Sequence, residues 1–479
     1  MRFIYTIVLI LIIGTAYGQQ VQQLTLEDII ERARAQSPSA KQAETRKENR
    51  YWQYRFYKSN YNPQLRLNGN LPGYNRDFAR NTIGEFQPRE QYTSFINLGL
   101  NQPIAITGGN LSVNSSLDYF NNASTDFTQY NSTVVNIRLD QPLFAFNPLK
   151  WDKKTEPLRY EESKRDFVEE MEAISREAVD RFFSYLDAQI NLQIAQFNLA
   201  NNDTIYKIEQ GRYNIGTTSK DKLLQVELQL LRSRQDVAQA NLDMETSKLA
   251  LRSFIGISID ESIELALPEA IPAFDVDFDE ALKYARDNRA DFIAFERRKL
   301  EAERAVAQAR GERFESNLSA SLGYNNLTSQ LQEAYNDPNA QERVNITFSI
   351  PILDWGRNKA RMQTALANQR LTDYVIAQDE QNFEQEIITQ VRRFEMLRTQ
   401  LEITKKSDEV AQERYTVAQN RYLIGKIDIT NLNIALTEKD NAKRSYVNAL
   451  RAFWTAYFDL RRLTLYDFVN NTLLYKPEE

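Results

Sequence analysis

The absence of both cysteine and histidine from the 479 residues limits the chemistry open to this chain. Without them it can form no disulfide, no thiolate or imidazole metal site, and no Ser-His-Asp or Cys-His nucleophile. Paired carboxylates, as used in glycoside hydrolysis, remain available, but the acidic residues gather on predicted helix faces, where solvation explains them. The net charge of -6 gives no reason to expect a nucleic acid partner. We therefore expect no enzyme, no metal and no cofactor.

Polar residues recur around two nearly identical pentapeptides, "RYNIG" at 212–216 and "RYLIG" at 421–425. Each one separates two long stretches of helical pattern, and its last glycine would let the chain reverse direction. A carboxylate just after such a reversal can face a shared opening or simply begin a solvated helix, and the sequence leaves both interpretations open. The nearby residues of interest are Asp221, Tyr422, Asp428 and Asn431.

The two pentapeptides belong to a tandem duplication of the chain. Their offset in numbering, 421 less 212 or 209, also relates Pro142 to Pro351, in "DQPLFAFNPLK" and "SIPILDWGRNK". Nearer the N-terminus the offset is 252, as between "LTLEDIIERA" (24–33) and "VDFDEALKYA" (276–285). The first half therefore contains about 44 extra residues before Pro142. A unit duplicated in this way usually buries its surface only against its copy.

Six segments alternate between apolar and polar residues, which indicates β-strands with one apolar face. In "NLSVNSSLDYF", for example, Leu111 and Val113 point one way while Ser112 and Asn114 point the other. Pro142 and Pro351 would be the barrel-to-helix junctions, since proline can end strand pairing. The segments are 64–70, 95–103, 110–120, 135–141, 316–325 and 343–350.

The alternation fits either a soluble β-sandwich or a transmembrane β-barrel. The polar face is rich in asparagine and small uncharged residues, as in a watery lumen, and this favours the barrel. Connections predicted at 72–91, 121–130 and 326–342 are longer than the tight turn "ITGGN", which also favours it. Six strands are too few to enclose a lumen, since about eight is the practical minimum. Other copies of the chain must then complete the wall.

One pair of strands is extra in the first half. "NLGLNQPI" (97–104) resembles "NIRLDQPL" (136–143), as if one hairpin had been duplicated. The extra hairpin, near 92–130, would either widen the barrel or fold outside its wall. We favour the wider barrel because these segments alternate as regularly as the others.

Long helices follow each set of strands. Arg357 to Ile424 contains neither Gly nor Pro, and as one helix it would span roughly 100 Å at about 1.5 Å per residue. A similar run from Leu158 to Gln210 precedes the first pentapeptide. Heptad spacing predicts an apolar seam at Leu224, Leu228, Leu231, Ala238, Leu242 and Leu249, and a second stripe at Phe383, Ile387, Val391, Phe394, Leu397 and Leu401.

The segment 1–18 has the features of a secretory signal peptide. It contains Arg2, an apolar run from Ile7 to Ile13, and the small residues Ala16 and Gly18 at the expected cleavage site. An uncleaved anchor helix is the alternative. Because no later apolar stretch is long enough for a spanning helix, a membrane-spanning part would have to be a β-barrel.

Taken in order, these features resemble the outer-membrane efflux protein (TolC) family. The resemblance covers nearly the whole mature chain and rests on "LTLEDIIERARAQSPSAKQAE", on "QPLFAFNPLK" and "IPILDWGRNKAR", and on "RYNIGTTSKDKLL" and "RYLIGKIDITNLN". It implies a mixed α and β membrane protein, a homotrimer whose transmembrane β-barrel continues into a long coiled-coil α-helical barrel. It implies a place in the outer membrane of a Gram-negative bacterium, extending into the periplasm. The implied partners are a periplasmic adaptor (membrane fusion) protein, an inner-membrane transporter and outer-membrane lipid.

The resemblance also implies that the hairpin ends form a periplasmic entrance, narrowed by an acidic residue, a tyrosine and an arginine. Asp221 and Tyr422 match the first two. Asn431 stands where the family has an aspartate and Ile427 where it has the arginine, so the gating network is only partly present. Asp428 is the candidate substitute for the missing charge. The expected tip turns and adaptor contacts are Arg212, Tyr213, Gly216, Arg421 and Gly425.

We therefore expect a passive exit duct of a tripartite efflux or type I secretion system, and the alternative is a structural or adhesive coiled-coil envelope protein. Family members contribute four strands per subunit, so six would make eighteen rather than twelve. The expected organisation begins with a signal peptide (1–18). The first repeat follows, with N-terminal helices (19–60), strands (61–146) and a helical hairpin (147–257). After a linker (258–276), the second repeat has helices (277–314), strands (315–352) and a helical hairpin (353–465), and a tail (466–479) ends the chain.

Overall fold

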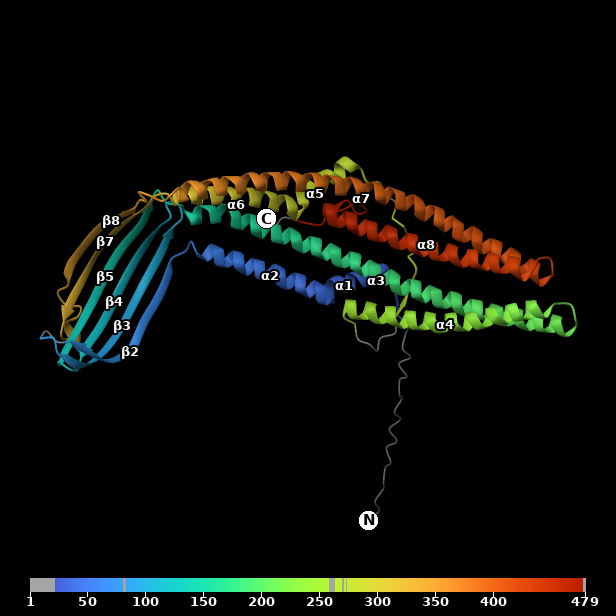
Figure 1. The fold of residues 1–479 in the computed structure, drawn as a ribbon, viewed down its shortest axis with the longest axis horizontal. Helices are drawn as coiled ribbons and strands as arrows, with labels where there is room; N and C mark the ends of the chain where they lie inside the picture. Colours follow the sequence, from blue (N-terminus) through green and yellow to red (C-terminus); the bar gives the residue numbers. More distant parts are fainter. Residues whose placement is uncertain (1–21, 81–82, 258–262, 269–270, 273, 477–479) are drawn as a thin grey trace, which may run out of the picture. The chain divides into compact units, whose positions relative to one another are not determined.

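The computed structural model describes residues 22–80, 83–257, 263–268, 271–272 and 274–476 (Figure 1). The predicted signal peptide lies outside the described residues. The chain divides into two compact units. We call Met1–Thr45, Phe167–Asn288 and Glu384–Glu479 the helical unit, and Arg46–Asp166 and Arg289–Phe383 the sheet unit. Within the described ranges, no helix has an apolar stretch long enough to cross a membrane.

The tandem duplication predicted from the sequence is confirmed by the shorter helices. α1 (Leu26–Gln36) and α5 (Phe278–Asn288) each have 11 residues. α2 (Pro38–Ser59) and α6 (Ala290–Gly311) each have 22 residues. The first residues of both pairs are related by the offset that the sequence shows near the N-terminus.

The long helices repeat with equal regularity. α3 (Pro148–Asn214) and α7 (Arg357–Leu423) both have 67 residues, and α4 (Lys220–Ile255) and α8 (Ile429–Thr464) both have 36. The first residues of both pairs are related by the same offset as the two pentapeptides. α3 begins before the predicted run at Leu158 and continues through Pro157.

The sheet unit contains one antiparallel sheet in the order β2-β3-β4-β5-β7-β8 (Figure 1). Within the described chain, the edge strands β2 and β8 are each paired on one side only. The extra pair β3 and β4 lies inside this sheet, between β2 and β5. The strands are β2 (Gln64–Arg80), β3 (Phe86–Ile104), β4 (Gly109–Asn122), β5 (Phe127–Leu143), β7 (Glu315–Thr328) and β8 (Asn339–Ser349).

The connections are shorter than the sequence predicted, because the strands continue into the polar segments. They cover 81–85, 105–108, 123–126 and 329–338. The expected contrast between long and short connections is therefore wrong except for the β7–β8 loop. Alternation alone could not locate the strand ends, since polar residues fit both a solvated strand and a loop.

Cross-strand pairing gives the sheet one polar and one apolar face. One polar row runs through Gln64, Asn101, Ser112, Arg138, Ser321 and Arg343, and the next through Arg66, Gly99, Asn114, Asn136, Gly323 and Gln341. An apolar row on the opposite face runs through Leu65, Leu100, Val113, Ile137 and Leu322. The apolar face is open, with Leu65 66% and Phe348 74% exposed.

The two proline positions predicted as junctions lie close to the strand ends. Pro142 is the penultimate residue of β5 and is paired with Asn317. Pro351 lies just beyond β8, in the segment that leads to α7. Phe144 and Trp355, which follow them, are both 90% exposed.

The predicted linker and tail carry two small sheets. β6 (Ile263–Leu265) lies within the predicted linker and pairs in parallel with β1 (Gln22–Leu24). β9 (Tyr466–Asp467) and β10 (Thr472–Leu473) form an antiparallel pair within the predicted tail. Phe468 and Tyr475 are buried, so the tail packs on the helices.

The chain buries one of the two predicted apolar stripes and leaves the other exposed. The stripe on α7 is buried within the chain, with Ile387, Phe394 and Leu401 each at most 2% exposed. The predicted seam on α4 is left exposed by the chain itself, with Leu224 and Leu242 51% and 61% exposed. α4 buries Val226, Leu230 and Ala240 instead. Heptad spacing reveals an apolar stripe but does not identify what covers it.

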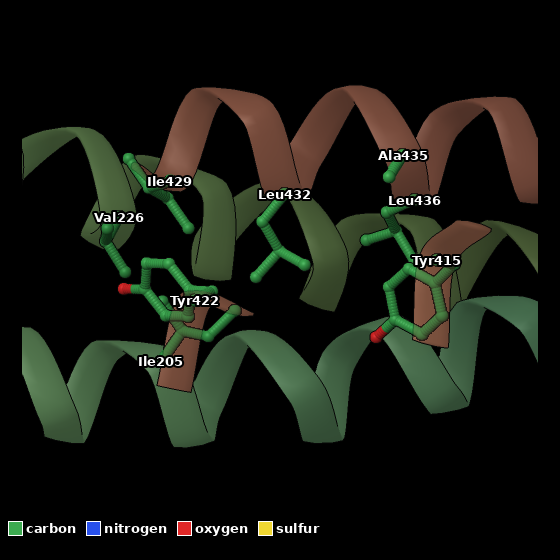
Figure 2. Packing of buried hydrophobic residues seen from close by; sticks show 8 residues of the cluster. All are labelled: Ile205, Val226, Tyr415, Tyr422, Ile429, Leu432, Ala435 and Leu436. Carbon is green, nitrogen blue, oxygen red and sulfur yellow. The ribbon is translucent and has the colours of Figure 1, made fainter. Parts of the chain in front are cut away.

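The ends of α3, α4, α7 and α8 share a buried apolar cluster (Figure 2). It fills the space between the four helices and therefore holds them together near their turns. Its members are Ile205, Val226, Tyr415, Tyr422, Ile429, Leu432, Ala435 and Leu436.

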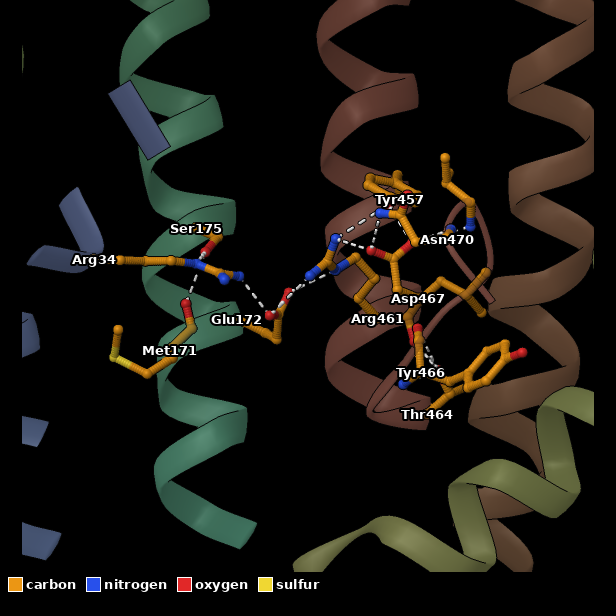
Figure 3. Close-up of polar contacts among 12 residues, drawn as sticks. Arg34, Met171, Glu172, Ser175, Tyr457, Arg461, Thr464, Tyr466, Asp467 and Asn470 are labelled. Carbon is orange, nitrogen blue, oxygen red and sulfur yellow. Dashed lines mark hydrogen bonds and ion pairs between the residues drawn. The ribbon is translucent and has the colours of Figure 1, made fainter. Parts of the chain in front are cut away.

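A buried ionic network crosses the other part of the helical unit (Figure 3). Glu172 on α3 is 2% exposed and pairs with Arg34 of α1 and with Arg461 of α8, whose Nε lies 2.9 Å from a Glu172 oxygen. Arg461 also binds Asp467 at 2.9 Å. Burial acts to raise the pKa of Asp467, but the hydrogen bond from Asn470 and the charge of Arg461 outweigh it and hold this pKa below its ordinary value. One carboxylate thus joins three helices.

Replacing Glu172 tests how much this ionic network stabilises the fold. Glu172→Gln leaves Arg461 buried with half of its counter-charge, and we expect the free energy of unfolding to fall by roughly 3 kcal/mol. The control is Glu177→Gln on the same helix, where the partner Arg181 is 3.1 Å away and both side chains are 45% exposed. There the loss should stay below about 0.5 kcal/mol. Denaturant unfolding followed by circular dichroism measures both, and equal losses would contradict the network's role.

Candidate functional site

The two pentapeptides form the turns of the α3–α4 and α7–α8 hairpins in the helical unit. Gly216 and Gly425 have positive φ angles of 78° and 74°, which glycine adopts without strain. The amide of Thr217 donates to the carbonyl of Arg212 at 2.9 Å, and the equivalent bond from Lys426 to Arg421 has the same length. Both helices therefore end in the same glycine-dependent closure.

Each returning helix begins with a side-chain cap. Ser219 accepts a hydrogen bond from the backbone of Lys222 at 3.4 Å. Its counterpart Asp428 accepts from both the backbone and the side-chain amide of Asn431, at 2.9 and 2.8 Å. The structure thus pairs two predicted gate residues with each other in a helix cap. Asp221, also predicted at the gate, is exposed in the first turn of α4.

Three side chains join the two hairpins next to their turns, and we call Glu209, Arg212 and Tyr422 the tip latch. The Tyr422 hydroxyl donates to Glu209 Oε1 at 2.9 Å, and Arg212 donates to the same oxygen at 2.7 Å. The Arg212 guanidinium also lies 5.5 Å from the centre of the Tyr422 ring. Tyr422 and Glu209 are only 3% and 5% exposed. A bond across the two hairpins is thus shielded from water, where it is strongest.

The surroundings fix the protonation of the latch. Burial raises the pKa of Tyr422, and the neighbouring Glu209 carboxylate raises it further, so the phenol stays neutral and donates. Burial also acts to raise the pKa of Glu209. The hydrogen bonds from Tyr422 and Arg212 outweigh it and place this pKa below the ordinary value. Glu209 is therefore an ionised acceptor at neutral pH.

A second set of polar contacts lies further along the same helices. Asn198 of α3 donates to the buried Asp440 of α8 at 2.8 Å, and Asn202 donates to Ser233 of α4 at 2.7 Å. Burial, with the added charge of Asp440, raises the pKa of Tyr415 to about 12. α3 thus bonds to the second hairpin as well as to its own partner helix.

Sequence reasoning identified Tyr422 but missed Glu209. Tyr213, the counterpart of Tyr422 in the first repeat, is 39% exposed, and the position equivalent to Glu209 is Ala418. Glu209 could have been predicted from its spacing, because it lies one helical turn after the apolar Ile205. This spacing places its carboxylate on the buried face of the helix.

The tip latch consists of a carboxylate, a guanidinium and a phenol joined by hydrogen bonds. Within the described part of the chain, no group of three acidic residues could hold a metal ion. The arrangement can do something mechanical: it holds two helical hairpins together at their turns through contacts that separate without breaking a covalent bond.

The family model and the solved structures that match this chain agree with each other. A family model described as "Outer membrane efflux protein" matches residues 29–257 and 281–464. No curated protein matches the chain by sequence. Among solved structures, the CmeC outer membrane channel of Campylobacter jejuni has 15% identity and a TM-score of 0.67, over 92% of this chain and 85% of that one.

Two further solved structures have similar scores. The outer membrane protein VceC of Vibrio cholerae has 16% identity and a TM-score of 0.64, over 92% of this chain and 95% of that one. The MtrE outer membrane channel of Neisseria gonorrhoeae has 18% identity and a TM-score of 0.63, over 92% and 88%. Likeness at this level of identity shows the fold.

The latch should respond to acid. Because the folded pKa of Glu209 lies below its ordinary value, its stabilising effect is present at neutral pH and is lost as pH falls through that lowered pKa. Spin labels at Thr217→Cys and Lys426→Cys, in this cysteine-free chain, report the separation of the two turns. We expect a narrow distance distribution at pH 7 that broadens in acid below the ordinary glutamate range.

Glu209→Gln provides the test of this assignment. The amide cannot ionise, so the distribution should be broad already at pH 7 and should not change further in acid. Glu227→Gln, an exposed position on α4, serves as the control and should behave like the unmodified chain. If Glu209→Gln keeps the narrow distribution at pH 7, the latch does not hold the turns together.

Proposed function

Because the chain belongs to the outer membrane efflux protein family, and is therefore a protein of the outer membrane, we propose that it is the exit duct of a tripartite export system. Three copies enclose a water-filled path that passes through the outer membrane and extends into the periplasm. Substrates enter from an inner-membrane transporter, which supplies the energy and is joined to the duct by a periplasmic adaptor. The duct itself conducts passively.

The two faces of the sheet are the observation that supports this proposal most. An apolar face as exposed as that of Leu65, Val344 and Phe348, at 66%, 70% and 74%, is unfavourable in water and suits lipid. The opposite face carries continuous polar rows suited to a lumen. A sandwich would bury the apolar face within the chain. Here the sheet needs lipid on one side and water on the other.

Assembly from several copies is supported by two exposed apolar stripes in the helical unit. The first is the α4 seam described above. The second, on α7, has residues seven apart, as in a coiled coil: Met396, Ile403, Val410 and Val417, which are 57%, 62%, 53% and 52% exposed. Two different stripes on one chain allow the α4 stripe of one copy to cover the α7 stripe of the next. Head-to-tail contacts of this kind form a ring when the rotation between successive copies closes, as it does for three copies related by 120°.

The tip latch would keep the entrance of this duct closed. Opening requires the α7–α8 hairpin to separate from the α3–α4 hairpin, and the Tyr422–Glu209 bond joins them. An adaptor that binds the turns better in the separated state would shift the equilibrium toward opening. The exposed turn residues Tyr213, Gly216, Arg421 and Gly425 are available for that contact, together with the half-buried Arg212.

Tyr422→Phe tests the gate. The substitution removes the one hydroxyl that bonds Glu209 to the α7–α8 hairpin and leaves its carboxylate with Arg212 and Thr218 of its own hairpin, so the closed state loses roughly 1–3 kcal/mol. We expect a several-fold rise in open probability in planar-bilayer recordings of the purified protein. Tyr213→Phe is the matched control, because its hydroxyl belongs to the exposed copy of the same motif.

The same recordings separate a duct from a structural or adhesive envelope protein. Conduction by the unmodified protein supports the duct, whereas a membrane-bound protein that never conducts, even with Tyr422→Phe, would favour the structural alternative. If Tyr422→Phe and Tyr213→Phe change the open probability equally, the tip latch does not control the gate, but the proposal of a duct still stands.

Asp221→Ala tests the role of the exposed carboxylate after the first turn. Three copies would form a ring of negative charge that attracts cations to the entrance. Removing it should weaken block by divalent cations added on the entrance side, without changing the single-channel current in monovalent salt severalfold. Asp236→Ala, exposed further along α4, is the control. Unchanged block after Asp221→Ala would exclude this aspartate from the entrance.

A further inference from the structure

The strand pair that makes the first half longer belongs to the wall of the sheet. β3 pairs with β2 from Gln64–Asn101 to Arg80–Phe86 and with β4 from Gln91–Asn122 to Ile104–Gly109. A hairpin folded outside the wall would leave β2 to pair with β5. In this structure β3 and β4 occupy that space completely.

The extra strands also share the two faces of the sheet. Asn101 and Ser112 continue the polar row that starts at Gln64, and Gly99 and Asn114 continue the next one. On the apolar face, Leu100 and Val113 lie in one row with Leu65. A segment excluded from a membrane wall would have no reason to keep both rows in register with its neighbours.

The β2–β3 and β4–β5 hairpins are closed at their base in the same way. The Gln102 side-chain amide donates to the carbonyl of Pro103 at 2.7 Å and to that of Tyr61, before β2, at 2.9 Å. The Gln141 amide donates to the carbonyl of Pro142 at 2.8 Å and to that of Thr107, before β4, at 3.1 Å. The two glutamines occupy equivalent positions in the internal sequence repeat, "NLGLNQPI" and "NIRLDQPL". The second hairpin is therefore a structural copy of the first.

We propose that this duct has an eighteen-stranded barrel, formed when β2 of each of three copies pairs with β8 of the next. The proposal rests on the proposed function, which supplies the three copies. With six antiparallel strands, β2 and β8 run in opposite directions, so the new contact is antiparallel like the other five. In lipid neither edge can leave its backbone groups unpaired, and a second copy of the same sheet satisfies both edges.

The strand number sets the width of the exit. At a strand spacing of about 4.8 Å and a tilt of about 40°, the wall radius is roughly 18 Å for eighteen strands and roughly 12 Å for twelve. The cross-section is about doubled. The barrel then admits bulkier cargo than a twelve-stranded exit, and selection by size falls to the entrance at the hairpin turns.

Electron cryo-microscopy of the purified full-length protein in lipid nanodiscs tests the inference directly. The expected result is a three-fold particle with eighteen strands in the wall. A three-fold particle with twelve wall strands, and with β3 and β4 outside the wall, would overturn the inference but leave the proposed function standing. A monomer, or a particle with no closed barrel, would contradict the proposed function itself.

A shortened chain provides an independent test. Deleting residues 105–143 joins Ile104 directly to Phe144, so that β3 takes the place of β5 beside β7. We expect this variant to assemble with twelve wall strands. Because the chain has no cysteine, a Leu100→Cys and Ala320→Cys pair should form a disulfide in the shortened chain and none in the full-length one. The positive control is Leu139→Cys with Ala320→Cys, which are directly paired in the full-length sheet.

Disulfide formation between positions 100 and 320 in the full-length chain would overturn the inference, because two strands cannot then lie between them in the wall. If the shortened chain fails to fold, the same pair in the full-length chain still decides the question.

Discussion

The backbone edges of the sheet are the constraint on which the rest of this structure depends. β2 and β8 each present a row of N–H and C=O groups that the described chain does not pair. A solvated sheet can leave such groups to water, but a sheet in lipid cannot, because every unsatisfied group costs several kcal/mol there. The exposed leucines and valines on one face indicate lipid. A chain built in this way is incomplete alone, and in the proposed duct other copies of itself provide what it lacks.

The helical unit also leaves surfaces that the chain does not cover, but there they are apolar side chains rather than backbone groups. Its interior is held by apolar packing and by a few shielded ionic contacts, of which Glu172 between Arg34 and Arg461 is the most buried. Its surface keeps two apolar stripes that the chain does not cover. α8 buries sixteen of its 36 residues within the chain, whereas α4, of equal length, buries seven. This difference between two copies of one sequence unit agrees with the proposed contact of α4 with a neighbouring copy.

The duplication accounts for the order and lengths of the helices, and the differences between the two repeats support the proposed function. Both turns close with the same glycine geometry, yet only Tyr422 is buried against a carboxylate, while Tyr213 is exposed. The proposed gate rests on this difference between the two hairpins. The extra hairpin of the first half is a second departure, and it widens the sheet without altering the helices, whose lengths still match residue for residue.

The sequence by itself determined the duplication, the six strands with their two faces, the long helices and the position of both turns. These are local or periodic properties, and alternation, heptad spacing and glycine placement encode them directly. Only the tertiary structure decided that the α4 seam faces outward, that Asp428 caps a helix with Asn431, and that Glu209 binds Tyr422. Those outcomes depend on which surfaces meet between segments far apart in the chain, and periodicity shows that a surface is apolar without showing what will cover it.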